Sequence, residues 1–254
     1  MIAILAPTKT MDFTRGSLPE EQTRPYFEDV AYKIIEALHA FDKPGLSDLM
    51  DISEQLADLT HQRIRNFKKE PEKPNSRQAL FAYKGDVYAN MQVDSYTHDQ
   101  LLFAQDHLRI LSGLYGILRP LDLIQPYRLE MQTPLSVDKQ KDLYKFWGEQ
   151  LSNALLEDIR EQQTPMIINL TSNEYLKALP GKEIKKSLID IDFKEFRDGQ
   201  YKTIAIYSKK ARGLMADFII RHQIDLPEDL RAFDIEQYHF NESLSDEKTF
   251  VFTR

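Results

Sequence analysis

The stretch from Ser112 to Asp122 reads SGLYGILRPLD, and its two glycines could bring backbone amides close to a bound phosphate. Glycine allows a backbone to take a positive φ, or allows another molecule to approach a bare amide. The spacing indicates a helix-hairpin-helix-like element, in which Gly113, Tyr115 and Gly116 contact a nucleic-acid phosphate without reading bases. In this interpretation Gly113 takes the positive φ and Gly116 provides the close approach. The alternative is a tight turn between two helices and nothing more.

Basic side chains stand at the ends of apolar runs, where α/β folds place functional groups. In YSKKARGLMADFII three cations fall in the first turns of a predicted helix, where they oppose the helix dipole. A bound anion would resolve that conflict, whereas the alternative is a solvated helix face. We expect one phosphate-binding or DNA-binding cleft that takes Lys9, Lys84, Arg109, Arg119, Arg128, Lys209, Lys210 and Arg212.

Three carboxylates, Asp86, Glu130 and Glu174, lie among these cations in the sequence. They support the site either by orienting the arginines through ion pairs or by acid–base work on a substrate. No residue is assigned a catalytic role. The chain lacks a GxxxxGK[ST] loop, a GxGxxG motif after the first strand and an HExxH motif. With no cysteine, and no histidines at ligand spacing, we predict no metal site and no cofactor.

The charge balance limits the class of partner. The 254 residues carry a formal net charge of -7, whereas a typical nucleic-acid binder is basic. Binding is decided by the local patch rather than by the total charge, so a basic cleft in an acidic remainder is still compatible with DNA. The first apolar run is too short for a signal peptide or a membrane span, which predicts a cytoplasmic protein with no membrane partner.

The elements that must position these groups follow from periodicity and turn signals. We expect strands at residues 2–5, 79–83, 165–170 and 248–254, and a hairpin around Asp198 and Gly199. Helices are expected at residues 26–41, 52–67, 138–162 and 209–224, with another that a Thr97–Gln100 capping box opens and that runs to Leu111. This mixture predicts a single α/β (mixed α+β) domain over residues 1–254, with a mixed sheet flanked by helices and a basic cleft.

Several blocks of the chain are similar to a known family. APTKTMDF, YKGDVYANM, RILSGLYGILRPLDLIQPYRLEM, NLTSNEYLKAL and YSKKARGLMADFII resemble the signature blocks of the YaaA family of peroxide-stress response proteins. The blocks extend from residue 6 to residue 220, so the resemblance covers essentially the whole chain. The first block of the family is closer to SPAKTLDF. Thr8 and Met11 differ from that form, whereas Lys9 and Thr10 are retained.

The resemblance implies a cytosolic bacterial protein with one α/β domain, a helix-hairpin-helix element at residues 111–118 and a positively charged cleft. It also implies binding to duplex or branched DNA with little sequence preference, and a role in limiting free iron and oxidative damage under hydrogen peroxide. The expected oligomeric state is a monomer.

Two other functions stay open. The first is an enzyme acting on a small phosphate-bearing or nucleotide-like substrate, because a pure DNA groove has little use for the three acids. The second is iron handling, which the lack of cysteine and of grouped histidines makes indirect. The shape of the cleft discriminates between DNA binding and catalysis. A long open basic groove favours DNA, whereas a closed pocket with acids at its floor favours catalysis.

Overall fold

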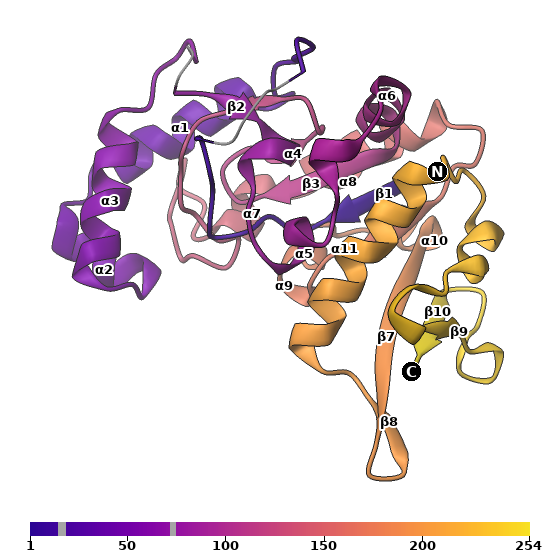
Figure 1. Cartoon of the computed structure of the whole chain (residues 1–254). Helices are drawn as coiled ribbons and strands as arrows, with labels where there is room; N and C mark the ends of the chain where they lie inside the picture. Colours follow the sequence, from indigo (N-terminus) through magenta and orange to yellow (C-terminus); the bar gives the residue numbers. More distant parts are fainter. Residues whose placement is uncertain (15–18, 72–74) are drawn as a thin grey trace.

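The structure is a computed structural model, and it describes residues 1–14, 19–71 and 75–254 of the chain. The fold is built around one mixed β-sheet (Figure 1). Its strands, in sheet order, are β4 (Gly116–Leu118), β3 (Leu108–Ser112), β1 (Ile2–Leu5), β6 (Ile167–Leu170), β7 (Leu188–Arg197), β10 (Thr249–Thr253) and β9 (His239–Phe240), with β8 (Gln200–Lys202) paired to β7. A separate small ladder pairs β2 (Arg77–Gln78) with β5 (Leu123–Ile124).

The centre of the sheet is parallel and its edges are antiparallel. Strand β1 runs parallel to β3 on one side and to β6 on the other, with Ala3 opposite both Leu108 and Ile168. All residues of these three strands are buried. Strands that are apolar on both faces need cover on both faces, which is typical of parallel sheets with helical crossovers. The prediction of a mixed α/β fold with a sheet flanked by helices is confirmed.

Helix α11 runs along one face of the sheet, and α2 and α3 form an outlying pair (Figure 1). The β7–β8 hairpin projects from the body at the bottom of the same view. The α-helices are α1 (Glu28–Leu38), α2 (Lys43–Met50), α3 (Glu54–Arg65), α4 (Ala79–Ala82), α5 (Asp86–Ala89), α6 (His98–His107), α7 (Leu143–Trp147), α8 (Gln150–Arg160), α9 (Asn173–Leu176), α10 (Lys182–Lys186) and α11 (Ala205–Arg221). Short 3₁₀ helices are η1 (Val93–Ser95), η2 (Pro227–Ala232), η3 (Ile235–Gln237) and η4 (Glu242–Leu244).

Local signals place several element ends correctly. Thr97 and Gln100 form the predicted capping box at the start of α6. Asp198 and Gly199 turn the β7–β8 hairpin with φ values of 51° and 77°, as the Asp-Gly signal predicts. Among the described residues, no helix combines the length and the apolar composition that crossing a bilayer requires.

Three predicted elements are wrong in type or extent. The long helix at residues 138–162 is divided into α7 and α8, because Gly148 takes a φ of 51° that ends the first of them. Residues 79–82 form the short helix α4 rather than a strand. Helix α11 begins at Ala205, a full turn before the predicted start, so Lys209, Lys210 and Arg212 lie beyond its first turn.

The predicted helix-hairpin-helix element is a β-hairpin. Helix α6 ends at His107, and the next residues form β3, which pairs with β1 on one side and with β4 on the other. The apolar run after His107 continues the predicted helix in the sequence, but its residues are buried along their whole length, which suits a central strand. The segment after Arg119 continues into β5 and not into a second helix.

The two glycines of this hairpin have the reverse of their predicted roles. Gly116 takes the positive φ, 69°, and a Cβ there would lie 2.8 Å from the Trp147 ring. Gly113 provides a close approach, but to protein, because its Cβ would lie 2.8 Å from the Leu129 carbonyl oxygen. Both residues are buried. The expectation that their amides face solvent or a phosphate is therefore wrong.

Candidate functional site

A cavity of about 440 Å³ opens at the carboxyl ends of β1 and β6. The strand order reverses at this point. The next strand of this sheet after β1 is β3, which lies on one side of the β1–β6 pair, and the next strand after β6 is β7, which lies on the other side. Ligands of open α/β sheets bind in such a crevice. The cavity is lined by residues 6–10, 85–87 and 127–130, by Leu170, Ser172, Glu174 and Tyr175, and by Lys209 and Arg212 of α11.

One side of this pocket contains a compact charged group centred on Glu130. The Lys9 ammonium lies 2.8 Å from Glu130 Oε1, and Arg128 Nη2 lies 3.5 Å from the same oxygen. The Lys9 side chain is 59% exposed, whereas those of Arg128 and Glu130 are 13% and 16% exposed. Because Lys9 follows β1 and Glu130 follows β5, this contact forms only after the chain has folded.

The pocket also contains guanidinium groups with unused donors. The Nε atoms of Arg128 and Arg212 are buried and have no hydrogen-bond partner among the described residues. Burial lowers the pKa of Arg212 from its ordinary value, while Asp192 and Asp190 act in the opposite direction. A buried donor of a charged group that lacks a partner is costly, and an absent ligand is one of its standard explanations.

Glu174 lies in the helical turn after β6 and is half-buried. Its Oε1 accepts a hydrogen bond of 3.3 Å from the Gln132 backbone N–H. Burial raises the pKa of Glu174 above its ordinary value, and the neighbouring charge of Glu130 adds to this shift, against the Gln132 hydrogen bond and Lys9. Asp86, the third acid, is exposed at the start of α5 on the rim of the pocket.

Helix α11 is held against α5 by direct backbone contact. A Cβ at Gly213 would fall well inside contact distance of the Val87 carbonyl oxygen, and 2.9 Å from the Val87 carbonyl carbon. Only glycine permits this approach. Arg212 is the preceding residue and Val87 lines the pocket, so the contact sets how far the Arg212 side chain reaches into the cavity.

The structure thus brings together seven of the predicted residues, namely Lys9, Arg128, Lys209, Arg212, Asp86, Glu130 and Glu174. The lining is mixed in charge. Lys84 and Lys210 flank it and are exposed. Lys84 pairs with Asp12 at 3.4 Å, and Lys210 borders a separate hollow beside Tyr207 and Arg254.

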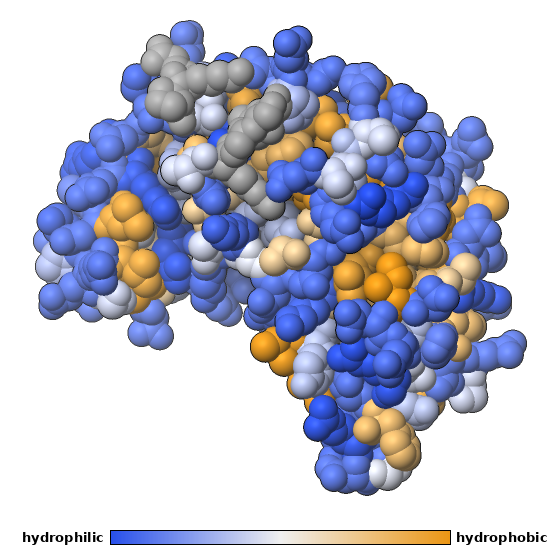
Figure 2. Space-filling model, in the orientation of Figure 1, coloured by the Kyte–Doolittle hydropathy of each residue, from blue (hydrophilic) through white to orange (hydrophobic). Residues whose placement is uncertain are grey.

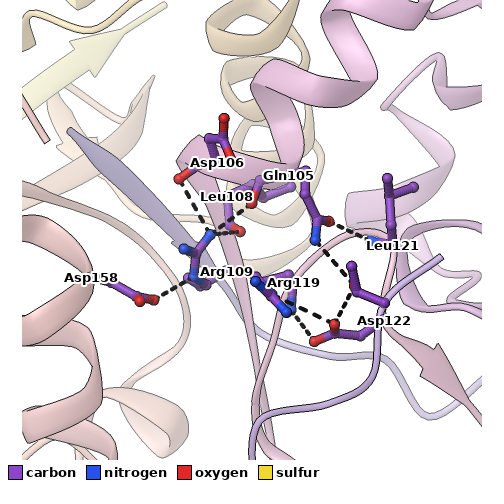
Figure 3. A network of polar contacts seen from close by, with 9 residues as sticks. Gln105, Asp106, Leu108, Arg109, Arg119, Leu121, Asp122 and Asp158 are labelled. Carbon is purple, nitrogen blue, oxygen red and sulfur yellow. Dashed lines mark hydrogen bonds and ion pairs between the residues drawn. The ribbon is translucent and has the colours of Figure 1, made fainter. Parts of the chain in front are cut away.

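Five predicted residues lie elsewhere. Arg109 is buried, where its Nε donates to Asp158 at 2.6 Å and its Nη1 donates to the carbonyl oxygens of Gln105, near the end of α6, and of Leu108, which follows α6 (Figure 3). Arg119 pairs with Asp122 in the same region, at 3.6 Å (Figure 3). Gly113, Tyr115 and Gly116 are inside the protein, and the Tyr115 hydroxyl accepts from Gln125 N. The expectation that Arg109 and Arg119 reach one cleft with Lys9 is wrong.

Other residues of the pocket were not singled out from the sequence. They are Thr8, Tyr127, Ser172 and Tyr175. The family blocks contain all four, and Thr8, Ser172 and Tyr175 lie in the segments that follow β1 and β6, so position after a strand was the available signal. Among the described residues, no cluster of three or more His, Asp or Glu side chains is placed to hold a metal ion.

The face drawn in Figure 2 is mostly hydrophilic. Its outline is hollowed between the outlying α2–α3 pair and the projecting β7–β8 hairpin, which carries paler, less hydrophilic side chains (Figure 2). Phe196 and Tyr201 of that hairpin are 58% and 42% exposed.

The matches to known proteins, like the family blocks in the sequence, extend over nearly the whole chain. The family model for peroxide stress protein YaaA matches residues 1–244. A UPF0246 protein from Acaryochloris marina (strain MBIC 11017) is 45% identical over 255 residues, which cover 100% of both chains. A UPF0246 protein from Cellvibrio japonicus (strain Ueda107) is 42% identical over 254 residues, with 100% of this chain and 98% of the relative covered. The chain therefore belongs to the peroxide stress protein YaaA family.

Proposed function

We propose that this member of the family acts by binding a small phosphate-bearing, nucleotide-like ligand in the pocket at the ends of β1 and β6. The observation that carries the proposal is the buried Nε of Arg212, which has no partner among the described residues. Guanidinium groups suit phosphate oxygens because their donors form a planar fork. Arg128 offers a second unused Nε in the same cavity.

The size and the apolar part of the lining support a ligand larger than phosphate alone. Small-molecule sites commonly occupy 300–1,000 Å³ and place a few polar groups among apolar and aromatic side chains. The cavity of about 440 Å³ falls in this range, and Leu129, Tyr127 and Tyr175 supply the apolar part. A nucleobase would pack against such rings, and the sugar would lie between the base and the phosphate. This is the enzyme or small-ligand alternative that the three acids indicated.

The experiment is a thermal melt of the full chain with nucleoside 5′-monophosphates, inorganic phosphate and the matching nucleosides. A ligand that binds only the folded state stabilises it by about 2.7 kcal/mol at a hundred times its Kd. We expect at least one nucleoside monophosphate to raise the melting temperature more than inorganic phosphate or the matching nucleoside alone. Equal, negligible shifts with all of the nucleotides would contradict the proposal.

DNA binding is a second candidate, which the exposed cations around the pocket favour. Lys9, Lys84, Lys209 and Lys210 are all exposed, and the first turn of α11 contains no acid. A DNA backbone laid across this rim would contact lysines without entering the pocket, consistent with binding that ignores sequence. With either ligand, the proposed cellular role is in the response to hydrogen peroxide, as the description of the family suggests.

Exchanging Lys84 and Lys210 for alanine separates the two candidates, because neither residue lines the pocket. If DNA is bound on the rim, the slope of log K against log salt should flatten by about 2, since each lost phosphate contact removes about 0.9. Affinity for a nucleotide should stay unchanged. The matched control removes Lys43 and Lys185, which lie on α2 and α10. Fluorescence anisotropy with duplex and branched DNA measures the slope, and equal slopes for both double variants would exclude the rim.

A further inference from the structure

Glu130 is an anion that the protein itself places among the cations of the pocket. Its Oε1 lies 2.8 Å from the Lys9 ammonium and 3.5 Å from Arg128 Nη2, and its Oε2 accepts from the Gln132 side chain at 3.4 Å. Lys9, Arg128 and Glu130 all line the cavity. A phosphate that enters the cavity therefore meets two cations that already have a carboxylate beside them.

The ion pair between Glu130 and Arg128 is incomplete when it is compared with other arginine pairs of this chain. Arg109, Arg221 and Arg254 each contact a carboxylate oxygen through Nε, at 2.6, 2.8 and 2.9 Å. The Arg128 side chain is also mostly buried, but its contact with the carboxylate is 3.5 Å long and comes from Nη2. Its Nε is buried and has no hydrogen-bond partner among the described residues. The donor that the other three arginines use is therefore unused in Arg128.

The unused donor belongs to an edge of the guanidinium group that suits a phosphate. The Nε–H and one N–H of Nη2 point in the same direction along one edge of the planar group, so together they bind two oxygens of one anion. Glu130 contacts this edge of Arg128 through a single oxygen, which it shares with Lys9. A terminal phosphate group has enough oxygens to meet Nε, Nη2 and the Lys9 ammonium separately.

Charge favours the same exchange of anions. Lys9 and Arg128 supply two positive charges, and Glu130 supplies one negative charge. A terminal phosphate group carries a charge of about −1.5 to −2 at pH 7. A phosphodiester or a carboxylate carries a single negative charge, as Glu130 does. Because the Lys9 side chain is 59% exposed, its ion pair with Glu130 contributes little to stability and is easily broken. A terminal phosphate therefore displaces Glu130, whereas a diester only repeats the charge that Glu130 already provides.

We propose that Glu130 stands in for a phosphate group in the free protein, and that the ligand binds by displacing Glu130 from Arg128 and Lys9 with a terminal phosphate. The inference rests on the proposed nucleotide ligand and makes Glu130 the residue that selects terminal phosphates over phosphodiesters. After its release from the two cations, Glu130 keeps the contact with the Gln132 side chain. No covalent bond changes, because one anion replaces another.

Glu130→Gln should tighten the binding of a nucleoside 5′-monophosphate by about 10-fold or more, and that of inorganic phosphate in the same direction. The variant removes the competing charge and keeps the size of the side chain. A hydrogen bond to a charged group that no longer has to be broken before binding corresponds to about 10-fold or more in affinity. Calorimetric titration of the full chain measures both ligands. If Glu130 served to orient Lys9 and Arg128, the same variant would bind more weakly, so the sign of the change decides.

A double-mutant cycle with Lys9→Met shows whether the gain depends on the cations that Glu130 contacts. In the Lys9→Met background Glu130→Gln should tighten binding by about 3-fold or less, because one of the two cations is absent. An equal gain in both backgrounds would overturn the displacement. The matched control is Glu28→Gln. The Glu28 carboxylate pairs with Arg24 at 2.7 Å, is 19% exposed and lies outside the lining of the cavity, so affinity should not change.

A cyclic 3′,5′-nucleotide, which is a phosphodiester, tests the selectivity. Wild type should bind it at least about 10-fold more weakly than the 5′-monophosphate of the same base, and equal affinities would overturn the restriction to terminal phosphates. A thermal melt shows whether Glu130→Gln is folded. Glu130→Asp is the second variant, and its shorter side chain retracts the carboxylate from both cations, so it should also bind more tightly than wild type. Nucleotides that bind wild type but neither variant more tightly would overturn the displacement alone, whereas nucleotides that bind none of the three proteins would remove both proposals.

Discussion

Gly213→Ala should destabilise the protein by about 3 kcal/mol or more, the largest effect that we expect from a single methyl group in this chain. The added Cβ would overlap the Val87 carbonyl group, and both sides of this contact are backbone. Backbone cannot move aside as the end of a flexible side chain can, so α11 and α5 must separate. Their contact also positions Arg212, and nucleotide affinity should fall with stability.

Urea unfolding of Gly213→Ala and wild type measures the difference in the free energy of unfolding. The matched control is Gly45→Ala, also in a helix and also without a positive φ, where the Cβ would lie 3.0 Å from the Asp42 carboxylate oxygen and 3.4 Å from the Phe41 ring, and so would meet side chains only. That variant should stay within about 1 kcal/mol of wild type, since alanine also has the higher helix propensity. Equal unfolding energies for the two variants would mean that α11 and α5 are not locked together.

Arg212→Met should weaken nucleotide binding by about 100-fold or more and leave the unliganded protein as stable as before. Removing the charged partner of a buried phosphate contact commonly costs 2–5 kcal/mol, and about 2.7 kcal/mol corresponds to 100-fold. Without ligand the same side chain is partly buried, and its buried Nε has no hydrogen-bond partner among the described residues. Replacing it by an apolar side chain of similar length therefore carries little cost in stability, or a gain.

Calorimetric titration with a nucleoside monophosphate and a thermal melt of each variant separate the two effects. Arg212→Lys keeps the charge but cannot reproduce the planar fork, so its affinity should fall between those of wild type and Arg212→Met. Arg160→Met, at the exposed end of α8, is the control and should change neither property. A destabilised Arg212→Met with unchanged affinity would make Arg212 a structural residue.

The sequence alone determined the elements whose signals are local. The apolar run before Pro7 predicted β1, the Thr97–Gln100 pair predicted the start of α6, and Asp198-Gly199 predicted the hairpin. Each of these signals acts between residues only a few positions apart, so its free energy is present in the sequence itself. The position of polar residues after apolar runs also singled out Lys9, Glu130 and Glu174 as candidate site residues, and the structure places all three in the lining of one cavity.

Tertiary structure decided whatever depends on distant partners. Leu108 to Leu111 are apolar at every position but Arg109, and a continuous apolar run fits a buried helix or a central strand equally well. Pairing with β1, about a hundred residues away in the chain, made it a strand. The same pairing sent Arg109 to Asp158 and away from the pocket. A basic residue after an apolar run can belong to the site only if that strand ends at the cavity between the carboxyl ends of β1 and β6. Which strands end there depends on the topology of the sheet.

The tertiary structure also decided which positions require glycine and which guanidinium donor has no partner among the described residues. Glycine is required at position 116 because its φ is positive and because Trp147 and Leu151 fill the space where a Cβ would lie, and glycine is required at position 213 because the Val87 carbonyl group lies there. Helix α11 packs close to α5 and carries the Arg212 side chain into the cavity, where its Nε meets no partner among the residues that the structure describes. In each case the energy comes from atoms that the chain brings together only after folding, so no pattern of neighbouring residues encodes it.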